Sequence, residues 1–171
     1  LKNSVEVDVC IIGGGLTGLI TAITLSKLNC KIDIVTDNIN KSTKSNRTVA
    51  ISENNFNFLK KQNISPLLTK ETWSCSKMEL YSEIKNKKFL KIFELNNKQQ
   101  KKNILYMLEN SKIIKLMMQK VKKIKSISVI ENKKVHKISN SGLMKSVKFN
   151  NDNNSKYNLV IISSGYENLL L

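Results

Sequence analysis

The fold follows from one run of residues near the start of the chain, Val9-Cys10-Ile11-Ile12-Gly13-Gly14-Gly15-Leu16-Thr17-Gly18. Its apolar part is typical of a buried parallel strand. The glycines that follow have the spacing G-x-G-x-x-G, and residues 19–29 have the pattern of a helix. A second strand is predicted for residues 31–35. The run therefore opens a βαβ unit of about thirty residues.

Three glycines of this run have a physical role at a dinucleotide site. Gly13 permits the tight turn, and Gly15 has no Cβ, so the backbone can approach a pyrophosphate. Gly18 lets the helix pack closely on the strand, and the helix N-terminus offers N–H groups and a positive dipole end to phosphates. The run predicts a dinucleotide site, but alone it fits NAD dehydrogenases as well as flavoproteins.

The chain is strongly basic, but the kind of basic residue it carries does not indicate a nucleic-acid partner. The 171 residues carry a net charge of +16, from 28 lysines and the single arginine Arg47 against 13 acidic residues. Nucleic-acid sites favour arginine, whose planar fork binds bases and phosphates through two hydrogen bonds. We therefore expect a solvated lysine coat, with attraction to an anionic membrane as the next interpretation. Cys10, Cys30 and Cys75 have no metal-ligand spacing and are expected to be reduced thiols.

The rest of the chain alternates strand and helix patterns. A polar loop is predicted for residues 37–45, and Trp73 and Tyr81 are expected to be packing residues. Alternation over residues 78–84 predicts a strand with one solvated face, which residues 89–95 could pair with. The other expected elements are helices at 53–62 and 110–125, strands at 128–131 and 159–162, and a hairpin formed by 134–138 and 143–149. The apolar face of the second helix is expected to pack against a sheet.

Three further segments narrow the class of protein. They are Arg47-Thr48-Val49-Ala50-Ile51-Ser52, Tyr106-Met107-Leu108-Glu109-Asn110, and the apolar strand that ends in Ser163-Ser164-Gly165. In this order and spacing, the chain resembles the FAD-dependent aromatic-ring monooxygenases over essentially its whole length, and most of all the hydroxylases of ubiquinone biosynthesis. The resemblance implies a Rossmann-like α/β FAD-binding domain over residues 1–171, incomplete at its C-terminal end, with a parallel sheet and a β-meander. Residues 76–97 would be the first strands of a substrate-binding sheet.

The resemblance also implies an activity for a full-length enzyme of about twice this length. That enzyme would hydroxylate the ring of a polyprenyl-phenol quinone precursor, using FAD, O2 and NAD(P)H. It would be cytoplasmic, with peripheral association at the inner membrane or with a biosynthetic complex. Residues 1–171 alone would bind FAD weakly and would not hydroxylate. Two alternatives stay open: a related FAD-dependent reductase or halogenase, and a catalytically inactive nucleotide-binding or basic adaptor protein.

Site residues follow from the same resemblance, and none of them is expected to be catalytic or to bind metal. The implied cofactor-binding residues are Gly13, Gly15, Thr17, Gly18, Thr36, Asp37, Arg47, Thr48, Asn110, Val135 and Gly165. Thr36 stands where the family has a glutamate that binds the adenosine ribose, and Asp37 could serve if the strand end shifts by one residue.

The remaining implied roles each have a plainer alternative. Arg47 would meet the flavin and its phosphate region, or it is a chance surface arginine. Asn110 would lie near the flavin, or it is a helix N-cap. The backbone of Val135 would contact the adenine, while its side chain suggests only an ordinary strand residue. Ser164 replaces an aspartate of the family and weakens the case for NAD(P)H. His136 has no second histidine or carboxylate pair nearby that would suggest a metal or base role.

Overall fold

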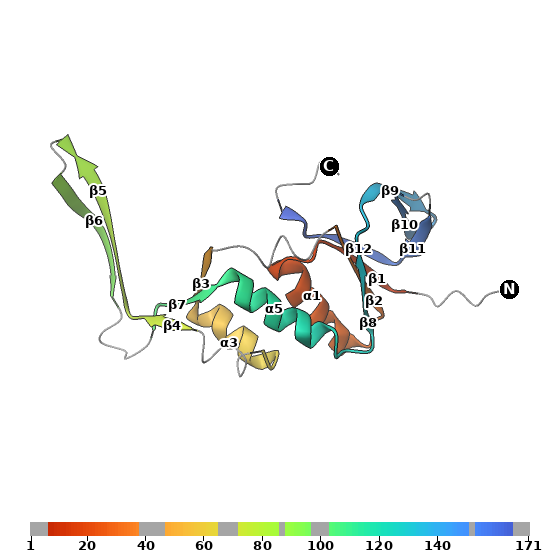
Figure 1. Ribbon diagram of the computed structural model, residues 1–171, viewed down its shortest axis with the longest axis horizontal. Helices are drawn as coiled ribbons and strands as arrows, with labels where there is room; N and C mark the ends of the chain where they lie inside the picture. Colours follow the sequence, from red (N-terminus) through yellow and green to blue (C-terminus); the bar gives the residue numbers. More distant parts are fainter. Residues whose placement is uncertain are drawn as a thin grey trace. The chain divides into compact units, whose positions relative to one another are not determined.

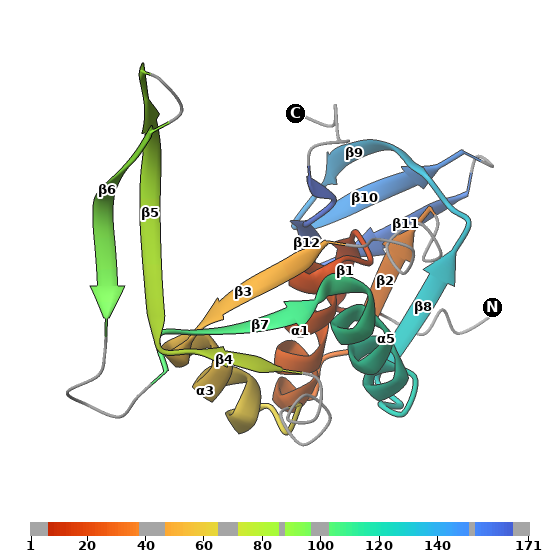
Figure 2. The ribbon, with the colours of Figure 1, turned by 60° about the vertical axis from the view of Figure 1, so that its left-hand side comes forward.

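The chain forms two compact units, a larger one from residues 1–45 and 111–171 and a smaller one from residues 46–110. The elements are drawn in Figure 1 and, turned by 60°, in Figure 2. The computed structural model describes residues 7–37, 47–64, 72–85, 88–96, 103–150 and 153–165.

A four-stranded parallel sheet is the centre of the larger unit, with the strand order β12-β1-β2-β8. Its strands are β1 (Val9–Ile12), β2 (Ile32–Thr36), β8 (Ile127–Glu131) and β12 (Leu159–Ile162). Helix α1 (Leu16–Leu25), followed by the 3-10 helix η1 (Ser26–Leu28), joins β1 to β2. Every residue of β1 is buried, which explains why its sequence is apolar throughout rather than alternating.

An antiparallel sheet of three strands forms a second layer of the larger unit. Its strands are β9 (Val135–Ser141), β10 (Met144–Phe149) and β11 (Asn154–Tyr157), with β10 in the middle. Figures 1 and 2 show this sheet on one face of the parallel sheet, with α1 and α5 (Asn110–Val121) on the other. The core between the two sheets contains Cys10, Ile12, Val35, Val147, Phe149 and Tyr157. This layered arrangement confirms the Rossmann-like domain with a β-meander that the sequence predicts.

One polar contact crosses this apolar core. The hydroxyl of Tyr157, which is 1% exposed, donates to Asp33 Oδ2 over 2.9 Å. Burial raises the pKa of the Asp33 carboxyl, and the hydrogen bond from Tyr157 opposes that shift. Burial also raises the pKa of the Cys10 thiol to about 12, with a further contribution from the Asp33 charge. The group therefore combines a thiol that stays protonated with a carboxyl that is easier to protonate than usual.

The smaller unit contains an antiparallel sheet with the order β3-β7-β4. The strands are β3 (Thr48–Ser52), β4 (Trp73–Cys75) and β7 (Leu105–Glu109), and helix α3 (Glu53–Lys61) follows β3 directly. The Ser52 side chain caps α3 by accepting a hydrogen bond from the Asn55 N–H over 3.3 Å. The ring of Phe56 stacks on Tyr106 with centroids 4.0 Å apart, which fixes α3 on β7.

A two-stranded hairpin, β5 (Lys77–Ile84) and β6 (Lys88–Asn96), also belongs to the smaller unit. The expected strand pairing is confirmed, but the expectation of one covered face is wrong for this chain. Leu80 and its partner Phe93 are 54% and 46% exposed. Trp73 and Tyr81 are likewise exposed, at 63% and 50%, and so are not the packing residues that the sequence suggests. A two-stranded ribbon has no third layer that could cover Leu80, Phe93 and Tyr81, and Trp73 lies on the separate strand β4.

Most predicted elements occur with shifted ends. Helix α1 begins at Leu16 and ends at Leu25, and α5 ends at Val121 rather than at 125. Residues of the apolar face of α5, such as Ile113 and Met117, are buried as expected. Strands β3, β4, β7 and β11 are additional to those predicted. Apart from Asp37, the predicted polar loop at 37–45 lies outside the described residues.

Candidate functional site

The candidate site lies at the carboxyl ends of three strands of the larger unit. From the central strand β1, the sheet continues through β2 and β8 on one side and through β12 on the other. The Gly13 N–H donates to the Val35 carbonyl over 2.8 Å, and the Ser163 N–H donates to the Ile12 carbonyl over 2.8 Å. The strand order of the sheet therefore reverses between β1 and β12. Open α/β sheets bind ligands at the carboxyl ends of the strands on either side of such a reversal.

Two glycines of the loop are required by sterics. Gly13 has a φ of +120°, and a Cβ there would lie 2.6 Å from the Ser163 carbonyl oxygen. A Cβ on Gly18 would lie only 2.0 Å from the Gly13 carbonyl oxygen and 2.8 Å from Ser163 Oγ. Any side chain at these positions would push the loop away from β12 or α1 away from the loop. The geometry agrees with the tight turn and the close helix packing expected from the sequence.

Gly15 differs from these two glycines because it borders open space. A Cβ at Gly15 would have no neighbouring atom within 4 Å, and the residue is the N-cap of α1 in an extended conformation. No side chain caps this helix, its first turn has no acidic residue, and Thr17 in that turn is exposed. The first N–H groups of a helix lack partners within the helix, and its dipole favours an anion there. The end of α1 is therefore suited to a diphosphate.

The end of β2 carries a hydroxyl and then a carboxylate. Thr36, the last residue of β2, is 8% exposed, and its Oγ1 would lie 2.9 Å from a Cβ on Gly14. Asp37 follows it, is exposed, and forms an ion pair with Lys134 at 3.2 Å. The carboxylate at this strand end thus belongs to the residue after the strand, and the Thr36 side chain packs against the glycine loop.

Residues after β8 and β12 contribute less defined positions. Val135 is half-buried at the start of β9, pairs with Phe149, and packs against the core between the sheets. Gly165 has a φ of +69° and borders open space. Ser164 is half-buried.

Ser163 is a residue whose role the sequence did not indicate. Its hydroxyl donates to the Ile12 carbonyl over 3.1 Å, with the Gly13 carbonyl at 3.4 Å. These contacts tie the glycine loop to β12. The sequence placed Ser163 directly after an apolar strand. Many residues share such a position, so it did not single out Ser163.

A second set of site residues comes together in the smaller unit. Strands β3 and β7 pair antiparallel, with Thr48 opposite Glu109. At the end of this pairing the Asn110 N–H donates to the Arg47 carbonyl over 2.9 Å. Arg47 and Thr48 are exposed, and Asn110 is half-buried. Because Asn110 is the first residue of α5, rather than the residue before it, the structure gives no support to the N-cap alternative.

Other kinds of site are not found in the described part of the chain. No group of three or more His, Cys, Asp or Glu residues there is placed to hold a metal ion. His136 is exposed on β9. Among the described helices, none combines the length and the apolar character needed to cross a membrane.

Comparison with known families places the chain in a recognised class. Residues 6–158 match the family described as "FAD binding domain". The match spans β1, the glycine loop and β2, the R-T-x-A-I-S and Y-M-x-E-N segments, and the antiparallel sheet of β9, β10 and β11. A comparison with curated protein sequences gave no match.

Solved structures share the fold at low sequence identity. The p-nitrophenol 4-monooxygenase PnpA from Pseudomonas putida DLL-E4 is 17% identical with a TM-score of 0.79, over 96% of this chain and 42% of its own. PqsL, a probable FAD-dependent monooxygenase from Pseudomonas aeruginosa, is 12% identical with a TM-score of 0.72, over 91% and 41%. The tetracycline destructase Tet(51) is 15% identical with a TM-score of 0.68, over 94% and 39%. The chain thus spans about two fifths of the length of these proteins.

Proposed function

The chain belongs to the FAD binding domain family, so its cofactor is FAD, and from that premise we propose that it is the FAD-binding part of a flavin-dependent aromatic-ring monooxygenase. The observation that carries the proposal is the open N-terminus of α1 at the point where the strand order reverses. The N–H groups of that turn are suited to the diphosphate that links the two halves of FAD.

The described residues supply donors of the kind that such a cofactor needs. The backbone at Gly15 and Thr17 would hold the diphosphate, with Gly13 and Gly18 keeping the loop tight. The Asp37 carboxylate would accept hydrogen bonds from the hydroxyls of the adenosine ribose. These hydrogen bonds would compete with its ion pair to Lys134. The Val135 backbone would meet the adenine, and Gly165 would leave room for the cofactor.

In the smaller unit, Arg47 would supply a fixed cation to the flavin side of the cofactor. Its backbone is held by Asn110 through the 2.9 Å hydrogen bond. Arginine suits this role better than the lysines that dominate the chain, because its guanidinium is planar and donates through a fixed fork. Thr48 and the Asn110 side chain would add polar contacts beside it.

Bound FAD supplies the redox chemistry, activating O2 with electrons taken from NAD(P)H. The protein's part is to bind the cofactor, to orient a phenolic ring against it and to exclude water. We propose as substrate the aromatic ring of a polyprenyl-phenol quinone precursor, on the strength of the resemblance to the ubiquinone-biosynthesis hydroxylases. Ser164 has no carboxylate to offer the nicotinamide nucleotide, so the electron donor is the weakest part of this assignment.

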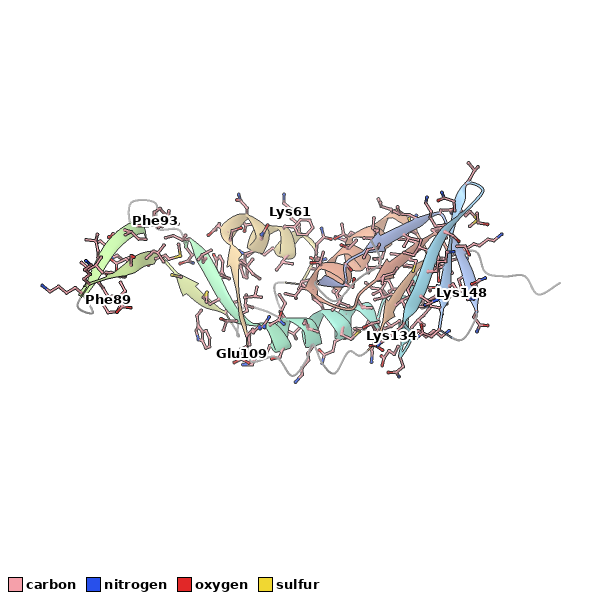
Figure 3. All side chains as sticks on the ribbon, turned by 90° about the horizontal axis from the view of Figure 1, so that it is seen from above. Lys61, Phe89, Phe93, Glu109, Lys134 and Lys148 are labelled. Carbon is pink, nitrogen blue, oxygen red and sulfur yellow. The ribbon has the colours of Figure 1, made fainter. Side chains whose placement is uncertain are left out.

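We assign the β5–β6 hairpin to a substrate-binding sheet. Four of its apolar side chains share one face in the strand register, where Leu80 pairs with Phe93 and Met78 with Leu95, while Phe89 pairs with Glu83 on the other face. The other face carries an ion-pair network in which Lys91 contacts Glu79 and Glu94. Figure 3 shows Phe89 and Phe93 on this hairpin. An exposed apolar face of this kind is suited to further strands and to a lipophilic ring.

The lipophilic substrate and the basic charge of +16 together suggest that the enzyme works at a membrane surface. We propose a cytoplasmic protein that associates peripherally with the inner membrane or with a biosynthetic complex there. Its small-molecule partners would be the phenol and O2.

The test is made on the full-length protein that contains this chain. We expect purified protein to carry flavin, to oxidise NAD(P)H faster when a prenylated phenol is added, and to release a product heavier by one oxygen from ¹⁸O2. Replacing Arg47 with Gln should weaken FAD binding about tenfold or more, since a charge-assisted contact is worth roughly 1.5–3 kcal/mol. Lys61→Gln removes one exposed charge from α3 and serves as the control.

Other outcomes separate the alternatives. Protein that never binds flavin would favour the inactive adaptor and would contradict the proposal. Flavin-dependent NAD(P)H oxidation without oxygen transfer would favour the reductase, and halide-dependent substitution of the ring would favour the halogenase.

A further inference from the structure

The outer face of the antiparallel sheet is a lysine surface. In the strand register, Lys148 lies directly opposite Lys137 on β9, and Lys156 of β11 lies opposite Ser146. Paired residues share a face, as do residues two apart on one strand, so these three lysines lie on the same face. The opposite face carries Val147 and Phe149, which are buried against the parallel sheet. Lys137, Lys148 and Lys156 therefore lie on the side of the sheet that faces away from the core.

No charge of the opposite sign lies on these strands. Strands β9, β10 and β11 contain no Asp or Glu. Lys137 and Lys148, side by side on neighbouring strands, give this face a positive charge that attracts an anionic surface. Figure 3 labels Lys148 on this sheet and Lys134, the residue directly before β9.

The tip of the β9–β10 hairpin adds an apolar side chain. Leu143 occupies the turn between the two strands, next to Gly142 with its φ of +64°, and is fully exposed at 102%. A protruding leucine at the edge of a lysine surface combines the two contributions that hold proteins at membrane interfaces, apolar burial and attraction to anionic headgroups.

We propose that this face of the β9–β11 sheet docks on an anionic phospholipid membrane, with the lysines over the headgroups and Leu143 inserted below them. The inference extends the membrane association in the proposed function by assigning it to a surface. A lipophilic substrate would then be taken up from the bilayer to which the domain is attached. A nucleic acid offers the same negative charge, but it has no apolar layer to bury Leu143.

The experiment measures co-sedimentation of the full-length protein with vesicles. We expect binding to mixed phosphatidylglycerol–phosphatidylcholine vesicles, weak binding to phosphatidylcholine alone, and release by salt. Each lysine near an anionic surface is worth about fivefold in affinity, so the triple variant Lys137→Gln/Lys148→Gln/Lys156→Gln should bind roughly 100-fold more weakly. Leu143→Ser should lower binding several-fold, and the loss should be larger in high salt than in low salt.

Matched controls remove the same charges and the same side chain elsewhere. Lys115, Lys122 and Lys123 are exposed on or just after α5, so their triple Gln variant changes the net charge equally without touching the sheet. Leu28→Ser removes another exposed leucine, from η1. Both controls should bind vesicles like the unmodified protein.

Three results would overturn the inference, and they differ in what else they affect. If the unmodified protein binds no anionic vesicle, the membrane association in the proposed function fails with it, while FAD binding and hydroxylation remain to be judged by their own assays. If it binds but the sheet variants and the α5 variants weaken binding equally, association stands and this surface is wrong. Salt-sensitive binding to nucleic acid in place of vesicles, unaffected by Leu143→Ser, would also overturn it.

Discussion

The backbone N–H of Asn110 donates to the carbonyl of Arg47 over 2.9 Å and closes the pairing of β3 with β7. Two sequence segments that are far apart in the chain thus end side by side. One contributes the chain's single arginine, and the other contributes the start of α5. The contact makes the backbone position of Arg47 depend on a strand pairing.

Two substitutions at Asn110 separate its backbone from its side chain. Asn110→Ala keeps the N–H, so we expect the free energy of unfolding to change by less than about 0.5 kcal/mol while FAD affinity falls. Asn110→Pro suits the first turn of a helix but removes the donor to Arg47, so it should cost roughly 0.5–1.5 kcal/mol. Urea unfolding and FAD titration measure the two effects. Equal stability of both variants would show that the N–H contact contributes nothing.

The glycines of the loop should differ in what their replacement damages. Gly18→Ala places a Cβ 2.0 Å from the Gly13 carbonyl oxygen and should destabilise the fold by about 1–3 kcal/mol, as overpacking does. Gly15→Ala meets no atom within 4 Å and should leave stability nearly unchanged. It should still weaken FAD binding, because the methyl group would occupy the space proposed for the diphosphate. Thermal unfolding with and without FAD distinguishes the two, and normal FAD affinity in Gly15→Ala would count against the site.

Loss of the Tyr157 hydroxyl should destabilise the core in a pH-dependent way. Tyr157→Phe leaves the half-buried Asp33 carboxylate without its 2.9 Å donor, which should cost about 1–3 kcal/mol at neutral pH. The cost should shrink at acid pH, where the carboxyl is protonated. Tyr81→Phe removes an exposed hydroxyl bonded to Glu79 at 3.3 Å and should change stability by less than about 0.5 kcal/mol.

Replacement of Asp33 by Asn should have the opposite sign. Because the folded-state pKa of Asp33 is raised, its contribution to stability is fully present below the unfolded-state pKa and is lost as the pH rises through the folded-state pKa. The charged carboxylate therefore disfavours folding at neutral pH. Asp33→Asn should be more stable than the unmodified protein at pH 7, with the difference vanishing in acid. Unfolding curves across that pH range decide the matter, and a stability loss at pH 7 would contradict the sign.

The three cysteines should react very differently with a thiol reagent. Cys10 is fully buried with a pKa of about 12, so almost none of it is thiolate at pH 8. Cys30 and Cys75 are only half-buried, and all three thiols are free. Iodoacetamide labelling followed by peptide mass spectrometry should modify Cys30 and Cys75 in native protein and Cys10 only after denaturation. Early labelling of Cys10 in folded protein would show that β1 is not held in this core.

Local patterns were enough to predict most of the larger unit, although not β11. The apolar run of β1 is a strand with every residue buried, as predicted, and the steric limits at Gly13 and Gly18 are those of any such turn. The β5–β6 pairing was likewise visible as two alternating segments around a short polar turn. The smaller unit was harder, because β3 and β7 look irregular alone and become strands by pairing with each other across a long separation.

The sequence by itself determined the βαβ unit, the glycine loop and the order of strand and helix patterns, because these depend on contacts between near neighbours. Only the tertiary structure decided which side chains meet. It placed Asn110 against Arg47, Ser163 against the glycine loop and Tyr157 against Asp33, and it left Trp73 and Tyr81 exposed. Burial and hydrogen bonding across distant segments are set by how layers pack, which periodicity along one segment does not encode.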